Sequence, residues 1–195
     1  MKIVLVGNIN VGKSSFFVRF KEGRFEEVLK STIGLDQCTK EITLSDGKTV
    51  KINLWDTAGL EVAGYMTSNY YRFSKGVVLM YDVKDRDTLN CLNSWIDDSK
   101  PYIPDQAPFF LLGNKIDSFA TEIEITKQDA VNFAKNNKIP EDQVFEISVK
   151  SGKGFKNFID SVANILSRDD NHVVDNAINL RVENQNNQNK LFGCC

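Results

Sequence analysis

The amino-acid sequence predicts an α/β domain with a six-stranded, mostly parallel sheet, one antiparallel hairpin strand and about five flanking helices. Two observations support this fold class. Short, nearly continuous apolar segments alternate with segments of helical period, an order typical of a parallel sheet that helices cover on both faces. In addition, an Asp-Gly pair at residues 46–47 separates two alternating runs, which is the sequence signal of a β-hairpin.

The strands are expected where the chain is apolar over a short run. The buried strands are predicted at residues 2–6, 76–83, 108–114 and 143–148, which read KIVLV, GVVLMYDV, PFFLLGN and QVFEIS. The hairpin is predicted within residues 41–55, EITLSDGKTVKINLW, and supplies the antiparallel pair.

Apolar side chains at helical spacing identify the helices between the strands. Two stripes have this spacing, one made of Leu89, Leu92, Trp95 and Ile96 and the other of Phe155, Phe158, Ile159, Val162, Ala163 and Leu166. Thr126, followed three residues later by Asp129, is the N-cap signal of a further helix. We interpret both stripes as core rather than as ligand-binding surfaces.

Composition and charge exclude several functional classes. The net charge of −2 gives no basic face, so nucleic acid is not an expected partner. The N-terminal apolar run IVLV is too short for a signal peptide, and no apolar stretch reaches the length of a membrane span. Cys38 and Cys91 are expected to be packing residues, and His172 has no second candidate ligand beside it for a metal site.

The first predicted strand runs directly into residues 7–14, GNINVGKS, which match the pattern G-x-x-x-x-G-K-[ST]. Glycines let the backbone curl so that successive N–H groups point at phosphate oxygens, and the helix that follows adds its positive N-terminus. Lys13 is placed to reach the β- and γ-phosphates, and Ser14 to offer its hydroxyl to Mg²⁺. This motif alone is also found in kinases and ATPases.

Two further stretches narrow the choice of nucleotide. DTAG at residues 56–59 puts Asp56 at the carboxyl end of a strand, where α/β sheets bind ligands and where a carboxylate can hold Mg²⁺. GNKID at residues 113–117 places Asp117 after another strand. Its carboxylate can accept two parallel hydrogen bonds from guanine, whereas adenine would leave a buried carboxylate unpaired.

At this point the chain resembles the Ras superfamily of small GTPases, and most closely its Rab branch. The resemblance covers residues 2–168 and rests on GNINVGKSS, STIGLD, WDTAG, YYR, YDV, GNKID, SVK and the terminal Cys-Cys. It implies a P-loop small G domain at residues 1–168 that binds GTP or GDP with Mg²⁺. The composition after residue 168 is rich in Asn and Gln and predicts a flexible tail at residues 169–195.

The resemblance also implies roles for individual positions. The nucleotide would contact Asn8, Ile9, Asn10, Val11, Gly12, Lys13, Ser14, Ser15, Phe25, Thr32, Gly59, Asn114, Lys115, Asp117, Ser148, Val149 and Lys150. Phe25 and the stem of Lys115 would stack on the two faces of guanine, and the Val149 N–H would donate to its oxygen. Mg²⁺ would be held by Ser14, Thr32 and Asp56.

Four positions would serve catalysis, namely Lys13, Thr32, Gly59 and Leu60. Leu60 stands where the family has a glutamine that orients the attacking water. Because leucine has neither a donor nor an acceptor, we expect slow GTP hydrolysis and a chain that stays loaded with GTP. The leucine is either natural to a divergent isoform or introduced to trap that state.

Other departures from the Rab pattern concern partners and the phosphate loop. Ile9 replaces a small residue near the γ-phosphate and is placed to block an arginine finger, while Asn10 replaces a glycine but tolerates unusual backbone angles. Trp55 and Tyr70 match two members of an aromatic triad that partners recognise, but Gln37 replaces the third, a phenylalanine.

The last residues match a lipidation signal. Cys194 and Cys195 would carry two prenyl groups, which anchor a protein stably without the help of a polybasic segment. The resemblance implies a switch in vesicle trafficking on the cytoplasmic face of an intracellular membrane, with a soluble cytosolic pool. Expected partners are an exchange factor, an activating protein, a GDP-dissociation inhibitor or escort protein, and effectors.

Two other functions stay open from the sequence. A guanine-nucleotide-binding pseudoenzyme that acts as a membrane-attached scaffold shares every binding motif and differs only in turnover. A P-loop kinase would need an acceptor site and a lid, and Thr32, Asp117 and the short chain argue against it.

Overall fold

The computed structural model describes residues 1–26, 36–57 and 68–168 of the chain. A six-stranded sheet with the strand order β2-β3-β1-β4-β5-β6 forms its centre. The strands are β1 (Lys2–Val6), β2 (Asp36–Thr43), β3 (Thr49–Asp56), β4 (Ser74–Asp82), β5 (Phe109–Asn114) and β6 (Val144–Glu146). Only the β2–β3 pair is antiparallel, which confirms the predicted sheet.

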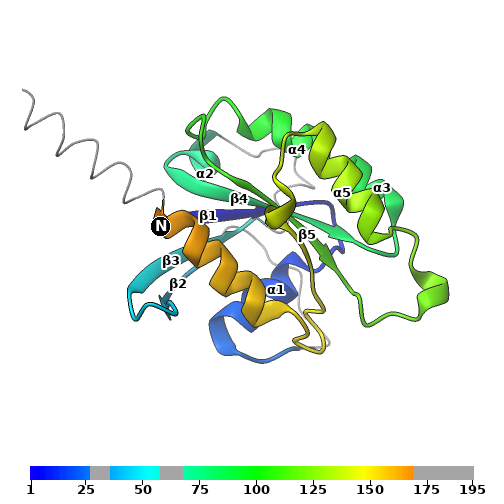
Figure 1. Ribbon diagram of the computed structural model, residues 1–195, viewed down its shortest axis with the longest axis horizontal. Coiled ribbons are helices and arrows are strands. Elements are labelled where there is room, and N and C mark those ends of the chain that lie inside the picture. Colours follow the sequence, from blue (N-terminus) through cyan, green and yellow to red (C-terminus); the bar gives the residue numbers. More distant parts are fainter. Residues whose placement is uncertain (27–35, 58–67, 169–195) are drawn as a thin grey trace, which may run out of the picture.

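Helices cover both faces of the sheet (Figure 1). They are α1 (Lys13–Glu22), α2 (Ser68–Tyr71), α3 (Arg86–Asn90), α4 (Leu92–Ser99), α5 (Lys127–Asn136) and a last helix over residues 155–168. Two short 3-10 turns, Ala120–Glu122 and Glu141–Gln143, complete the described part. No helix in these ranges is long and apolar enough to cross a membrane.

The strand β1 shows how the sheet separates two hydrophobic cores. Its side chains alternate, so that Ile3 and Leu5 pack with α1 and the last helix, while Val4 and Val6 pack with α3, α4 and α5. All four are at most 2% exposed. A strand buried on both faces explains why the sequence reads as a continuous apolar run.

The predicted local signals hold, with some changes in length. Asp46 and Gly47 form the hairpin turn, where Gly47 has φ 82° and Asp46 accepts a hydrogen bond from the Lys48 N–H. Thr126 and Asp129 form a reciprocal capping box at the start of α5. The hairpin strand β2 begins at Asp36, five residues earlier than the predicted hairpin at residue 41, because its polar side chains hide the strand pattern.

The prediction for the two internal cysteines is wrong for one of them. Cys91 is exposed and lies between α3 and α4, where a stripe that we predicted as one helix divides into two. Cys38 is half-buried and packs against the core, as expected. Leu89, Leu92 and Ile96 are buried on one side, so the stripe itself is core.

Candidate nucleotide-binding site

The loop between β1 and α1 has the backbone that its glycines predict. Gly7 has φ 148°, and a side chain there would meet the Met80 carbonyl oxygen at 2.1 Å. Gly12 has φ 103° and stands as the N-cap of α1, whose first turn carries no acidic residue and no side-chain cap. Asn10, which the sequence offers in place of a glycine, adopts φ 63°. The expectation that asparagine tolerates this conformation is confirmed, and the loop keeps the shape of an anion-binding turn.

Lys13 is the first residue of α1, directly after this loop, and is only 4% exposed. Its ammonium donates to the carbonyl oxygens of Gly7 at 2.9 Å and Asn8 at 2.8 Å. These two bonds fold the side chain over the loop, so that its charge lies where phosphate oxygens would be received. Ile9, at the tip of the loop, is 54% exposed and therefore faces whatever approaches the loop from outside.

Asp56 comes to the same edge of the sheet from the neighbouring strand. In the register of β1 and β3 it lies beside Leu5, two residues before the loop begins, and its side chain is 1% exposed. The next residue, Thr57, donates its hydroxyl to the Leu5 carbonyl at 2.8 Å and fixes the end of β3 against β1. This role of Thr57 was not seen in the sequence.

The donor chemistry fits Mg²⁺. Ser14 on the first turn of α1 and Asp56 at the end of β3 supply hydroxyl and carboxylate oxygens, the ligands that Mg²⁺ prefers beside water and phosphate. Within the described ranges no three His, Cys, Asp or Glu side chains gather as a metal site. An all-protein cage for a softer metal is therefore absent from this part of the chain, and Thr32 lies outside it.

Asn114 connects the two halves of the site. It ends β5, is 3% exposed, and donates through Nδ2 to the Val11 carbonyl of the phosphate loop at 2.9 Å. Its Oδ1 accepts a hydrogen bond from the Val149 N–H at 3.0 Å. One buried amide thus joins the loop after β1 to the loop after β6. The resemblance implies that the Val149 N–H donates to a guanine oxygen, a contact that would have to share or replace this bond.

The neighbouring Lys115 crosses back to the phosphate loop. Its ammonium donates to the Asn10 carbonyl at 2.8 Å and forms an ion pair with Asp82 at 2.6 Å. The ion pair holds the lysine stem across the edge of the sheet, where it is expected to stack on a base. Asp82, at the end of β4, is a site residue that the sequence analysis missed, although its place in the YDV segment marks the same strand end.

Asp117 does not have the surroundings that we expected. Its side chain is exposed rather than buried, so a bound base would itself have to cover the carboxylate before an unsatisfied charge could discriminate against adenine. Ser148 and Val149 are buried, whereas Lys150 is exposed. The loop they form is nevertheless well held.

A third residue that the sequence did not reveal, Arg19 of α1, holds this loop through hydrogen bonds. Its guanidinium donates to the carbonyl oxygens of Val149 at 2.5 Å and Lys150 at 2.9 Å. In the sequence Arg19 is one polar residue on a predicted helix. Its role could not be predicted, because no local pattern shows which distant loop it contacts.

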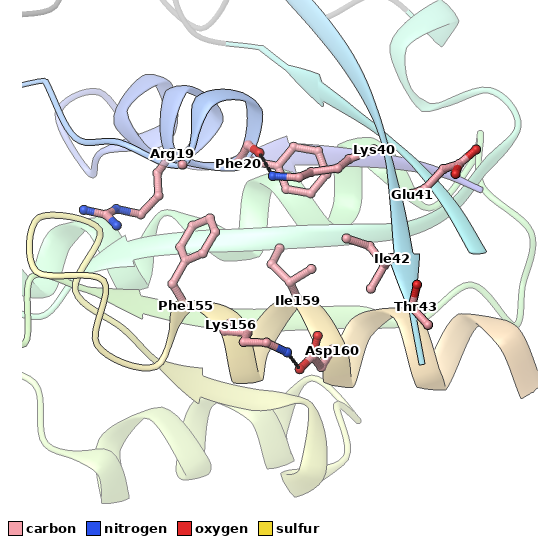
Figure 2. Close-up of a pocket in the computed structure, with 11 residues that line it drawn as sticks. Arg19, Phe20, Lys40, Glu41, Ile42, Thr43, Phe155, Lys156, Ile159 and Asp160 are labelled. Carbon is pink, nitrogen blue, oxygen red and sulfur yellow. Dashed lines mark hydrogen bonds and ion pairs between the residues drawn. The ribbon is translucent and has the colours of Figure 1, made fainter. Parts of the chain in front are cut away.

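Arg19 also stands at one end of a cavity of about 340 Å³ between α1, β2 and the last helix. Figure 2 shows Ile159 of the last helix facing Ile42 of β2 across this space, while Phe155 of the same helix points toward α1. None of the predicted nucleotide-binding residues lines the cavity. It is therefore separate from the candidate site at the carboxyl edge of the sheet.

Several predicted site residues lie outside the described part of the chain. They are Thr32, Gly59, Leu60, Cys194 and Cys195. Phe25 is described, is half-buried and packs against the core beside α1, and its contact with a base stays a prediction. Gln37 pairs with Trp55 in the β2–β3 register, so two of the three positions expected to face partners are direct neighbours.

The amino-acid sequence matches a family of nucleotide-binding proteins and several of its members. The model of the Ras family matches residues 2–168. The chain is 38% identical to the Ras-related protein Rab-12 of Homo sapiens over 135 residues, which cover 69% of this chain and 54% of Rab-12. It is 39% identical to the GTP-binding protein YPT1 of Saccharomyces cerevisiae over 142 residues, or 71% of this chain and 66% of YPT1.

A third relative matches along the whole chain. The Ras-related protein RabC of Dictyostelium discoideum is 34% identical over 197 aligned positions, which cover 100% of this chain and 96% of RabC. The match to Rab-12, in contrast, spans only a little over half of that protein's length. The chain belongs to the Ras family and is similar to small GTPases of the Rab type.

Proposed function

We propose that this chain is a Rab-like small GTPase that binds GTP and GDP at the edge formed by the loops after β1, β3, β5 and β6. The observation that carries the proposal is the buried Asn114 amide. It joins the phosphate loop at Val11 to the base-side loop at Val149. These two hydrogen bonds keep the phosphate-binding loop and the base-binding loop at a fixed separation, which suits a nucleoside di- or triphosphate.

The residues of the site have separable tasks in this proposal. The uncapped N-terminus of α1 and the curled loop offer N–H groups to the β-phosphate, and Lys13 adds its positive charge. Ser14 and Asp56 would hold Mg²⁺, which neutralises charge on the β- and γ-phosphates when bound. Lys115, fixed by Asp82, covers one face of the base, and Asp117 reads its edge.

Switching follows from the γ-phosphate. Thr32 and Gly59 are proposed to contact it, so that its loss releases the two segments around them and partners read the difference. Leu60 cannot orient the attacking water, and hydrolysis is proposed to be slow for that reason. If turnover were absent altogether, the same site would serve a membrane-attached scaffold that binds GTP without cycling.

The tail suggests where the switch works. Cys194 and Cys195 are proposed to be prenylated, which would attach the chain to the cytoplasmic face of an intracellular membrane and leave a soluble pool with an escort protein. Exchange factor, activating protein and effectors are proposed by analogy with Rab proteins, and so is a role in vesicle trafficking.

Nucleotide binding is tested in a competition assay. The chain is loaded with fluorescent GDP, and the displacement of this GDP by added GTP or ATP is measured. We expect GTP to displace it and ATP to fail at a thousandfold higher concentration. Lys13→Ala should abolish binding, whereas Lys21→Ala, on the exposed side of the same helix, should leave it unchanged. Equal displacement by ATP and GTP would contradict the proposal, and so would full binding by the Lys13→Ala variant.

A further inference from the structure

Phe73, between α2 and β4, is both exposed and held in an unfavourable conformation. Its side chain is 86% exposed, the highest value among the large hydrophobic residues of the described part. Its backbone has φ 63°, a left-handed conformation that bulky residues rarely adopt. Phe73 thus lowers the stability of the fold in two ways, because its apolar ring lies in water and its backbone is strained. It contributes almost nothing to the core. Such a combination points to a use outside the domain itself.

Basic residues flank Phe73 in the chain, and an exposed aromatic side chain contacts Tyr71, two residues before it. Arg72 and Lys75 are both exposed on either side of it in the chain. Tyr102, 43% exposed, stacks on Tyr71 with ring centroids 6.4 Å apart and planes 5° from parallel. We call Arg72, Phe73, Lys75 and Tyr102 the Phe73 face.

This face is at the end of the sheet opposite the nucleotide site. Ser74, the residue after Phe73, begins β4 and pairs with Lys2 at the start of β1. The Lys2 ammonium also donates to the Arg72 carbonyl at 2.9 Å. The candidate nucleotide-binding loops, in contrast, follow the carboxyl ends of the same parallel strands. A surface that meets the Phe73 face would therefore leave the nucleotide edge uncovered.

The chain leaves the domain beside this face. A side chain on Gly76, three residues after Phe73, would come within 3.4 Å of Leu166 in the last helix. That helix is described as far as residue 168, and Figure 1 shows this end of it next to the N-terminus of the chain. The last described residue, 168, therefore lies at the end of the domain that carries Phe73, and in the sequence the chain continues from there to Cys194 and Cys195.

We propose that the Phe73 face contacts the surface of an anionic phospholipid bilayer, with the ring of Phe73 among the headgroups. Aromatic side chains favour this interfacial layer, and basic side chains nearby are attracted to anionic lipids. The inference rests on the proposed membrane attachment, since a prenylated tail would keep the domain close to a bilayer. Asp169 and Asp170 follow directly in the sequence and lower the positive charge there, so Phe73 has to supply much of the contact.

The test separates this contact from lipidation. The full chain with Cys194→Ser and Cys195→Ser is mixed with vesicles of phosphatidylcholine alone or with phosphatidylserine, and the bound fraction is measured by co-sedimentation. We expect binding to the anionic vesicles. Phe73→Gly should weaken it about fivefold, the factor that corresponds to about half burying a phenyl side chain. Arg72→Glu should weaken it by at least about the same factor.

The matched control is Phe119, which is 77% exposed at the nucleotide edge. Phe119→Gly should leave vesicle binding unchanged, and all variants should keep fluorescent GDP binding. Equal losses from Phe73→Gly and Phe119→Gly would overturn the proposal. Absence of vesicle binding by the lipid-free chain would also overturn it and would favour a protein partner with an apolar pocket for Phe73. Neither result bears on nucleotide binding or prenylation, which are measured separately.

Discussion

The Asn114→Ala substitution tests whether one amide holds the two halves of the site together. In the structure the Asn114 side chain is the hydrogen-bond partner of both the Val11 carbonyl and the Val149 N–H. Alanine removes both bonds and leaves two backbone groups without their partner in a region where the side chain is 3% exposed. The effect should appear both in the stability of the fold and in the lifetime of the bound nucleotide.

The size of the effect follows from the cost of an unsatisfied buried polar group, about 1–3 kcal/mol each. Two such groups cost about 2–6 kcal/mol, and entry of water into the space left by the amide brings the expected loss to about 2–3 kcal/mol. If about 1.4 kcal/mol of this is lost from the nucleotide complex, release of GDP becomes about tenfold faster.

Two measurements check the expectation: urea unfolding of the GDP complex and the dissociation rate of fluorescent GDP. Asn132→Ala, at an exposed position of α5, serves as the control and should change neither quantity by more than about 0.5 kcal/mol. If Asn114→Ala releases GDP at the parent rate, the two loops do not depend on this amide. The two Asn114 hydrogen bonds would then no longer support the proposed function.

Three further predictions concern other residues. The pKa of Asp129 is lowered to about 2 by hydrogen bonds from Thr126 and by the Arg86 guanidinium, so its stabilising effect is present above about pH 4 and disappears as the pH falls through about 2. The difference in urea midpoint between the parent and Asp129→Asn should shrink over that interval. Phe73→Gly should raise the free energy of unfolding by about 1 kcal/mol in a urea titration, because glycine adopts φ 63° without strain. Asp117→Asn should remove the preference for GTP over xanthosine triphosphate in a competition assay, and an unchanged preference would show that the base binds elsewhere.

The sequence predicted most of the sheet because its strands carry their own signals. Residues 2–6 form β1 as predicted, since a strand buried on both faces has to be apolar throughout. The start of β2 was missed because an edge strand has polar side chains on most positions. The break at Cys91 was missed because a single apolar stripe continues across two short helices.

The residues of the candidate site could be predicted where they lie within one short sequence motif. Gly7, Gly12, Lys13 and Asn114 follow from local patterns, and the structure brings them to one edge of the sheet. Arg19 was not predictable in the same way, because its partners are 130 and 131 residues away in the chain. The Phe73 backbone was missed for a similar reason, since the surrounding fold rather than the local sequence imposes its conformation.

The most direct test of the proposed switch is single-turnover hydrolysis of preloaded GTP by this chain and by Leu60→Gln, measured side by side. We expect the parent to retain GTP and the glutamine variant to hydrolyse it at least tenfold faster, because glutamine restores a side chain able to orient the attacking water. Hydrolysis by the parent at the rate of the variant would contradict the proposed block at Leu60. If both were inert, the non-cycling scaffold would be the better description.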